Sequence, residues 1–216
     1  ASKGKVGEQR GGFPVKLYDS AMAPNPRRVR IFLAEKGIEV PVEQVDIGKA
    51  ENRKEPFLAK NPMGTLPVLE LDDGTHLAES IAICRYFEAL QPDPPLFGVG
   101  TEDIGVVEMW NRRMELEVFN AITGCFRNTH DFFKGRIPQV AEWGEVCRGA
   151  AEKRLAWLDE VLADREFIAG ERLTVADITA LCGIDFGRVT KIVIQPEQKN
   201  LARWHGAVSS RPSANA

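Results

Sequence analysis

The chain has 216 residues, of which 44% are hydrophobic and 27% charged, with a formal net charge of −3. The length exceeds the usual size of one domain, and the composition is that of an ordinary globular protein. The small negative charge gives no electrostatic basis for binding nucleic acid or an anionic membrane. No stretch approaches the roughly 18 consecutive apolar residues of a membrane span.

Residues 1–12 are basic, glycine-rich and without an apolar core, so the sequence predicts a disordered tail and no secretory signal. The four cysteines, Cys84, Cys125, Cys147 and Cys182, are scattered and form no CxxC pair. They are expected to be buried thiols in a reducing compartment. The three histidines are far apart, and no metal site is expected.

The first half of the sequence alternates between strand and helix patterns. A strand over 15–19 leads through a turn into a helix, for which Asn25 is the predicted N-cap and Pro26 the first helical residue. A second strand is predicted over 42–47, and a short helix over 56–60.

A predicted hairpin and a further helix complete this half. The strand 65–71 pairs with 75–77 through Asp72-Asp73-Gly74, and a helix follows over 81–90 with Ser80 as its predicted cap. Proline within a strand cannot donate to the ladder. Pro67 is therefore either a trans proline at the first residue of the strand or a cis proline that holds the preceding backbone out for a ligand.

The proline-rich run 91–98 marks a boundary between two parts of the chain. We expect an N-terminal domain over 13–90, a linker over 91–100 and an all-helical domain over 101–216. Two apolar stripes at helical spacing follow the linker, without any strand pattern. They consist of Val107, Trp110, Met114, Val118, Ala121 and Cys125, and of Trp143, Cys147, Ala151, Leu155, Leu158 and Leu162. Thr174 and Asp177 predict a capping box and a structural role for the aspartate.

Several runs, in this order, resemble the glutathione S-transferase superfamily over nearly the whole chain from Phe13. They are the segment 17–30 with its Ala23-Pro24-Asn25 turn, the segment 61–69, the segment 79–83 and the segment 167–178. The turn resembles that of nu-like bacterial and fungal relatives. The resemblance implies an α/β plus all-α fold, in which a thioredoxin-like βαβαββα domain precedes an all-helical C-terminal domain.

The resemblance also implies a glutathione site. Glu79 and Ser80 hold the γ-glutamyl end, and Leu66, ahead of Pro67, pairs its backbone with the cysteinyl amide. Independently, a helix N-terminus suits a carboxylate because it offers free N–H groups and a positive dipole end. Asn52 either reaches the glycine end of glutathione or is an exposed loop residue.

The thiol end departs from the commonest pattern of the superfamily. Only a few per cent of a free thiol is ionised at neutral pH, so the site needs a helix start or a hydrogen-bond donor that favours the thiolate. Ala23 occupies the position where serine-type relatives carry a hydroxyl, and it has no donor. Asn25 and Ser20 remain as candidate donors, and Asn25 is otherwise a purely structural N-cap. Tyr18 is interpreted as a packing residue.

The implied activity is that of a glutathione transferase, in which the thiolate attacks a hydrophobic electrophilic small molecule. Glutathione is the co-substrate, and no metal is expected. Candidate walls for the second substrate are Met22, Trp110, Arg113, Met114 and Phe119. One alternative is a glutathione-dependent reductase of disulfides or organic hydroperoxides, and another is a non-catalytic glutathione-binding protein. A cytoplasmic homodimer is expected, without nucleic-acid or membrane partners.

Overall fold

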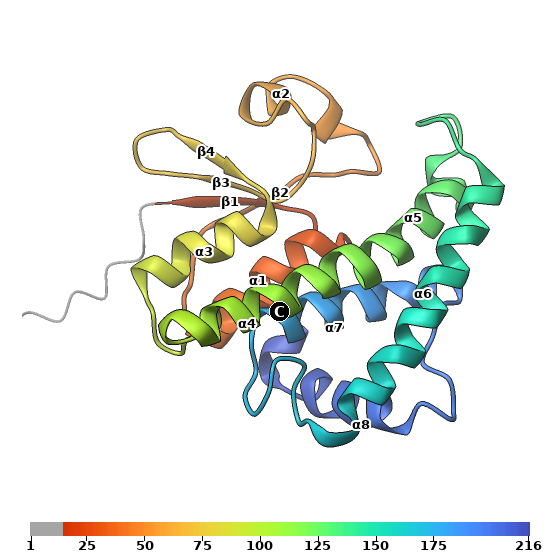
Figure 1. Ribbon diagram of the computed structural model, residues 1–216. Coiled ribbons are helices and arrows are strands. Elements are labelled where there is room, and N and C mark those ends of the chain that lie inside the picture. Colours follow the sequence, from red (N-terminus) through yellow and green to blue (C-terminus); the bar gives the residue numbers. More distant parts are fainter. Residues whose placement is uncertain (1–14) are drawn as a thin grey trace, which may run out of the picture.

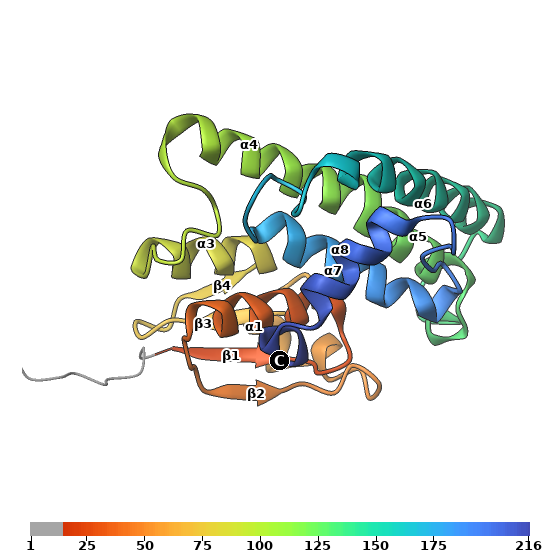
Figure 2. The same cartoon turned by 90° about the horizontal axis from the view of Figure 1, so that it is seen from below.

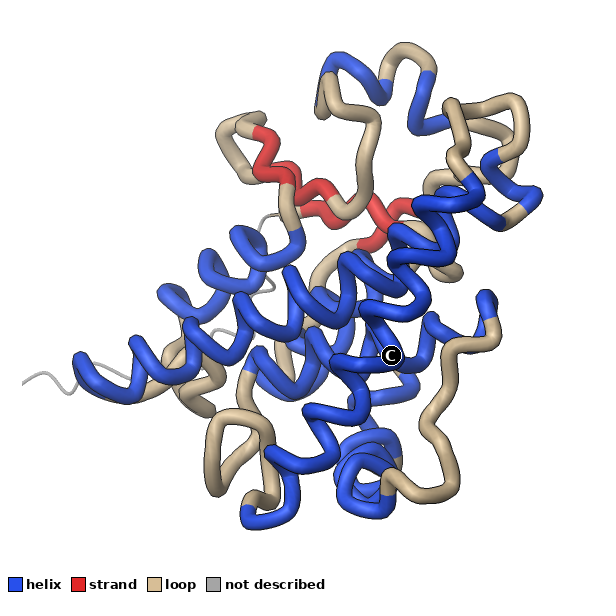
Figure 3. The backbone as a smooth tube through the Cα atoms, turned by 45° about the vertical axis from the view of Figure 1, so that its right-hand side comes forward, coloured by secondary structure: helices blue, strands red, loops and turns tan. Residues whose placement is uncertain are grey.

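The computed structural model describes residues 15–216 (Figure 1). The predicted tail, 1–12, and the first two residues predicted for the N-terminal domain, 13 and 14, lie outside the described residues. The strands gather in one part of the molecule, and helices with their connecting loops form the rest (Figure 3). Within residues 15–216, none of the helices has the length and apolar character needed to cross a membrane.

The first half of the chain forms a four-stranded mixed sheet with the strand order β2-β1-β3-β4. β1 is parallel to β2 and antiparallel to β3, and β3 is antiparallel to β4. The elements are β1 (Lys16–Asp19), α1 (Pro24–Lys36), β2 (Val42–Gln44), α2 (Phe57–Lys60), β3 (Val68–Glu70), β4 (His76–Ala78) and α3 (Ser80–Leu90). The predicted order of strands and helices is confirmed.

The second half is helical. Its main helices are α4 (Gly100–Arg113), α5 (Asn120–Thr129), α6 (Ala141–Val161), α7 (Val175–Gly187) and α8 (Lys199–Ser209). Between α4 and α5 the helix widens into a π-helical stretch, η2 (Met114–Phe119), a rare form that is frequent at functional sites. Among the described residues beyond the linker, the only β contact is an isolated bridge between Phe167 and Gly170.

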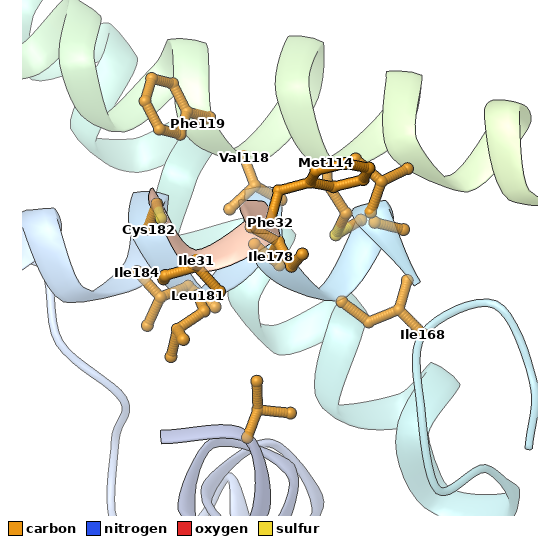
Figure 4. Packing of buried hydrophobic residues seen from close by; sticks show 14 of the residues in the cluster. Ile31, Phe32, Met114, Val118, Phe119, Ile168, Ile178, Leu181, Cys182 and Ile184 are labelled. Atoms are coloured by element: carbon orange, nitrogen blue, oxygen red, sulfur yellow. The ribbon is translucent and has the colours of Figure 1, made fainter. Parts of the chain in front are cut away.

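Alternation along β1 gives the sheet two apolar faces. Leu17 belongs to the main core, whereas Tyr18 joins a smaller cluster with Phe57 of α2. This follows because successive residues of a strand point to opposite faces. Seen from below, α1 lies between the sheet and the helices α7 and α8 (Figure 2). Ile31 and Phe32 of α1 lie beside Ile178 of α7, so both halves share one core (Figure 4).

Helix α7 is the central helix of this core. Nearly all of its residues are buried, as expected for a helix that is apolar on all sides. A capping box of Thr174 and Asp177 opens it. The buried Asp177 carboxylate also accepts hydrogen bonds from the Ile168 backbone N–H and the Trp204 Nε1, each at 2.9 Å. The structural role predicted for Asp177 is confirmed.

Two helix starts differ from the predictions. α1 begins at Pro24, so Asn25 is the second helical residue and not the N-cap. Pro24 and Pro26 both fit the first turn, where a missing N–H breaks no helical hydrogen bond, so the proline pattern did not fix the start. α3 begins at Ser80 itself, and the position of its N-cap is taken by Glu79 without a side-chain bond. The prediction of Ser80 as the cap was wrong.

Strand β2 ends at Gln44, earlier than the predicted 42–47. Beyond it, the Asp46 N–H donates to Glu51 Oε2 at 2.8 Å, and Asp46 Oδ1 accepts from the Lys49 N–H at 3.1 Å. Side-chain oxygens that take up backbone bonds compete with a strand ladder. The chain therefore turns away from the sheet at this point.

Candidate active site

The predicted site residues other than Asn52 lie in segments at one edge of the sheet. β1 and β2 are parallel and end at this edge, and Val68 at the start of β3 pairs with both Tyr18 and Ala78. β3 therefore begins, and β4 ends, where β1 and β2 end. The segments brought to this edge are 20–25, 66–67 and 79–80.

The turn between β1 and α1 is held by the buried Asp19. Its carboxylate accepts hydrogen bonds from Arg30 Nη1 and Gln44 Nε2, each at 2.6 Å. Arg30 Nη2 also donates to the Ala21 carbonyl at 3.1 Å, and Gln44 Oε1 accepts from the Ala21 N–H at 3.0 Å. The sequence did not point to Arg30 or Gln44, although a buried carboxylate at a strand end requires partners.

The start of α1 exposes a single backbone donor. Ala23 is the N-cap in an extended conformation, and its N–H donates to the Ser20 carbonyl at 2.9 Å. Of the first three helical residues only Asn25 has a backbone N–H, because Pro24 and Pro26 lack one. The positive end of the helix dipole thus offers an anion the Asn25 N–H, with a carboxamide on the same residue.

The two candidate donors lie in different surroundings. The Asn25 side chain is half-buried, and its Oδ1 accepts a hydrogen bond from Arg28 Nη2. Ser20 is buried, at 6% exposure, and borders a cleft of about 480 Å³ between the turn, the loop after β2 and the helical half. Other residues that line the cleft are Met22, Ile47 and Phe132.

The residues predicted for the γ-glutamyl and cysteinyl parts of glutathione flank the β3–β4 hairpin. The Leu66–Pro67 peptide bond is cis, which is the second of the two forms considered from the sequence. Leu66 precedes Val68, the first residue of the ladder. Glu79 is exposed with a φ of +70°, uncommon for a residue other than glycine, and Ser80 is buried at the first position of α3.

Asn52 fastens the short helix η1 (Glu51–Arg53) to the turn before Leu66. Its Nδ2 donates to the Gly64 carbonyl at 2.7 Å. Gly64 has a φ of +59°, and a Cβ there would lie 2.8 Å from the Asn52 carbonyl oxygen, so the contact requires glycine. Arg53 Nη1 donates to the Met63 carbonyl at 3.2 Å. The sequence did not point to Arg53, whose guanidinium is a suitable partner for a carboxylate.

Tyr18 lies on the opposite face of the sheet, toward α2. Its hydroxyl donates to Glu70 Oε2 at 2.5 Å, and this bond lowers the pKa of Glu70. Its ring meets that of Phe57 edge-on at 6.3 Å. The interpretation of Tyr18 as a packing residue is confirmed.

Most of the walls predicted for a second substrate are not available to it. Trp110, Met114 and Phe119 are buried in the helical core, at 4%, 0% and 2% exposure. The helical stripe in the sequence predicted that these residues share an apolar face. It did not predict that α6 and α7 cover this face. Met22, at 86% exposure, does border the cleft. The sequence missed Phe132, because only the folded chain brings it to the turn before α1.

Comparisons with known proteins follow the same division of the chain. Residues 23–90 match the family model described as the glutathione S-transferase N-terminal domain, and residues 120–212 match the one described as the C-terminal domain. The chain is similar to glutathione S-transferase 2 of Saccharomyces cerevisiae, with 39% identity over 204 residues that cover 91% of this chain and 86% of the relative.

Solved structures show the same likeness. A glutathione S-transferase domain-containing protein of Marinobacter aquaeolei superposes with a TM-score of 0.88 at 40% identity, covering 92% of this chain and 98% of that one. Gtt2 of Saccharomyces cerevisiae gives a TM-score of 0.87 at 38% identity, covering 92% and 97%. The predicted fold, thioredoxin-like and then all-helical, is confirmed.

Proposed function

Because this chain belongs to the glutathione S-transferase superfamily and is a glutathione S-transferase, we propose that it binds glutathione at the sheet edge where 20–25, 66–67 and 79–80 meet. The thiol then lies at the start of α1, beside Asn25. The single free backbone N–H of Asn25, adjoining its own carboxamide, is the observation that carries this placement.

The peptide part of glutathione is held by the two sides of the β3–β4 hairpin. Ser80 and its N–H at the positive end of α3 receive the γ-glutamyl carboxylate, and Glu79 accepts from the α-ammonium group. Leu66 pairs its backbone with the cysteinyl amide ahead of Pro67. Asn52, with Arg53 beside it, takes the glycine carboxylate.

Asn25 is favoured over Ser20 as the thiolate donor. Asn25 supplies a backbone N–H and an amide at the positive helix end, whereas Ser20 precedes the turn and borders the neighbouring cleft. The resulting thiolate attacks an electrophilic carbon, a sulfur–carbon bond forms, and the leaving group departs with its electron pair. The turn Ala23-Pro24-Asn25 supports the assignment of a nu-like site.

The second substrate occupies the cleft of about 480 Å³ beside the turn. The side chains of Met22, Ile47 and Phe132 suit a hydrophobic electrophile. The turn Ala23-Pro24-Asn25, which resembles that of nu-like relatives, favours a second activity, the reduction of disulfides or organic hydroperoxides. In that reaction bound glutathione is the redox thiol. A second glutathione then reacts with the oxidised first one, and the two leave as glutathione disulfide.

The remaining assignments concern the assembly of the protein. We place the domain boundary in the linker 91–100, which runs from the end of α3 to the first residue of α4. Ile104, Val106 and Met109 of α4 are exposed and apolar, which supports a homodimer. Four free buried thiols support a cytoplasmic location. Glutathione binding without turnover of any substrate in a screen would identify the chain as a non-catalytic glutathione-binding protein.

The proposal is tested by turnover of an aryl halide, a disulfide and a hydroperoxide with glutathione, beside a direct binding titration. Asn25→Ala is expected to slow aryl transfer and lower the thiolate fraction of bound glutathione. Ala23→Ser is expected to raise both, because a hydrogen bond to a charged group is worth about 1.5–3 kcal/mol. Loss of activity in Ser20→Ala, with Asn25→Ala unchanged, would identify Ser20 as the donor.

A further inference from the structure

A buried arginine connects the start of α1 to the helical domain. Arg28, at 4% exposure, donates through Nη1 to Glu115 Oε1 at 3.0 Å and through Nη2 to Asn25 Oδ1. Its guanidinium lies 4.5 Å from the centre of the Phe119 ring. A buried charge requires partners. The partners of Arg28 are Asn25 of its own helix, and Glu115 and Phe119 of the π-helical stretch η2.

This contact determines which way the Asn25 carboxamide faces. A carboxamide has an oxygen that only accepts and an NH2 group that only donates, whereas a guanidinium only donates. Arg28 therefore holds the oxygen of Asn25, and the NH2 group points away from Arg28. A thiolate can only accept hydrogen bonds, so this is the orientation that it needs.

We propose that Arg28 is a positioning residue for the transferase reaction, which fixes Asn25 with its NH2 group toward the glutathione sulfur. The inference rests on the proposed function, in which Asn25 is the thiolate donor. Arg28 does not touch the sulfur in this assignment, and it acts through the orientation of Asn25.

The second domain fixes Arg28 in turn. Glu115 also pairs with Arg112 through its other oxygen, at 2.5 Å. α7 approaches Phe119 at a glycine, since a Cβ at Gly183 would lie 3.0 Å from that ring. Burial raises the pKa of the Cys84 thiol on α3 and of the Cys182 thiol on α7, and the charge of Arg28 opposes this rise at both. Glu115 is thus the anionic partner of Arg28, and Asn25 its neutral one.

The test compares variants by ultraviolet titration of the thiolate in the enzyme–glutathione complex. Arg28→Lys keeps the charge but loses the planar fork that reaches Asn25 and Glu115 together. We expect Asn25→Ala and Arg28→Lys each to raise the thiol pKa by about one unit, with glutathione affinity, measured at a pH below the thiol pKa, within about twofold of wild type. Arg112→Lys is the matched control, because Arg112 contacts Glu115 but not Asn25, and it should leave the thiol pKa unchanged.

A double variant separates the possible results. Arg28→Lys should add nothing in the Asn25→Ala background if it acts through Asn25; a full additional shift there would overturn the proposal. A shift in Asn25→Ala without one in Arg28→Lys would also overturn it. No shift in Asn25→Ala would instead reject the proposed donor.

A crystal structure of the wild-type protein with glutathione gives a second measurement that needs no variant to fold. The expected result is the Asn25 Oδ1 on Arg28, with Nδ2 as the side-chain atom nearest the sulfur. A sulfur placed beyond hydrogen-bond reach of Nδ2, or an Asn25 released from Arg28, would contradict the positioning role.

Discussion

At the residue scale, Glu79 and Ser80 carry the clearest prediction for glutathione affinity. Each is expected to bond a charged end of the ligand, so Glu79→Ala and Ser80→Ala should each weaken binding by about 1–3 kcal/mol, measured by calorimetry. Because the Ser80 side chain makes no cap bond in α3, the melting temperature of Ser80→Ala should stay close to that of the wild type. Ser210→Ala, on an exposed serine after α8, is the control. Unchanged affinity in both site variants would refute the assignment.

Single residues also show the limits of prediction from the sequence. The capping box at Thr174 follows from a local pattern and is present. At Pro67 the local pattern left the trans and cis forms open, and the bond is cis. Asn25 was predicted as an N-cap because asparagine before proline is a common helix start, but the preceding Pro24 satisfies the same rule. Arg28 gave no signal, since the sequence does not show which arginine of a basic helix is buried.

At the scale of elements, Arg136 ties the segment after α5 to the loop after β2. Its guanidinium donates to the Ile47 and Gly48 carbonyls at 3.1 and 3.0 Å and lies 4.4 Å from the centre of the Phe132 ring. Arg136→Ala removes both bonds, worth about 1 kcal/mol together at an exposed site. The KM of the hydrophobic substrate should therefore rise about fivefold, with glutathione affinity unchanged.

Steady-state kinetics with both substrates varied will measure this effect. Arg136→Lys is the matched variant, because it keeps the charge and loses the fork, and it should show an intermediate KM. A change in glutathione affinity with no change in the KM of the second substrate would show that the segment does not border the second site.

The helical stripes were predicted well, except at the first residue of the second stripe. From Val107 to Cys125 the first stripe is buried, except for the partly exposed Ala121. Trp143, the first member of the second stripe, is 57% exposed. α6 approaches α5 through the next residue, since a Cβ at Gly144 would lie 2.4 Å from the Thr129 side chain. A close approach of two helices at glycine turns the neighbouring tryptophan outward.

At the scale of the whole molecule, the four cysteines report on global unfolding. All four are buried and free, and burial raises the pKa of Cys182 to about 12 and raises those of Cys84 and Cys147 as well. Thiolate is the reactive form. We therefore expect no rapid reaction with a thiol reagent at neutral pH in the native protein, and four reacting thiols in denaturant. One fast-reacting thiol in the native state would contradict this burial.

The arrangement of the two halves depends on contacts that no local pattern shows. Arg27 pairs with Asp185 at 2.6 Å, and Arg211 pairs with Glu35 at 2.7 Å, across more than 150 residues of sequence in each case. The order of elements could be predicted from periodicity and turn residues. The cleft could not, because its walls come from three segments that only tertiary packing brings together.

The Pro24-Asn25-Pro26 start of α1 has a consequence for the oxidation state of the bound peptide. The single amide hydrogen at this helix end, that of Asn25, matches a thiolate, in which one sulfur atom accepts the hydrogen bond. A sulfonate presents three oxygens, and a helix start without the two prolines would have further amide hydrogens for them. With both prolines in place, the extra oxygens of an over-oxidised glutathione lose water without gaining backbone partners. In the proposed site, the absence of amide hydrogens on Pro24 and Pro26 thus favours binding of the glutathione thiolate over binding of glutathione sulfonate, its irreversible oxidation product.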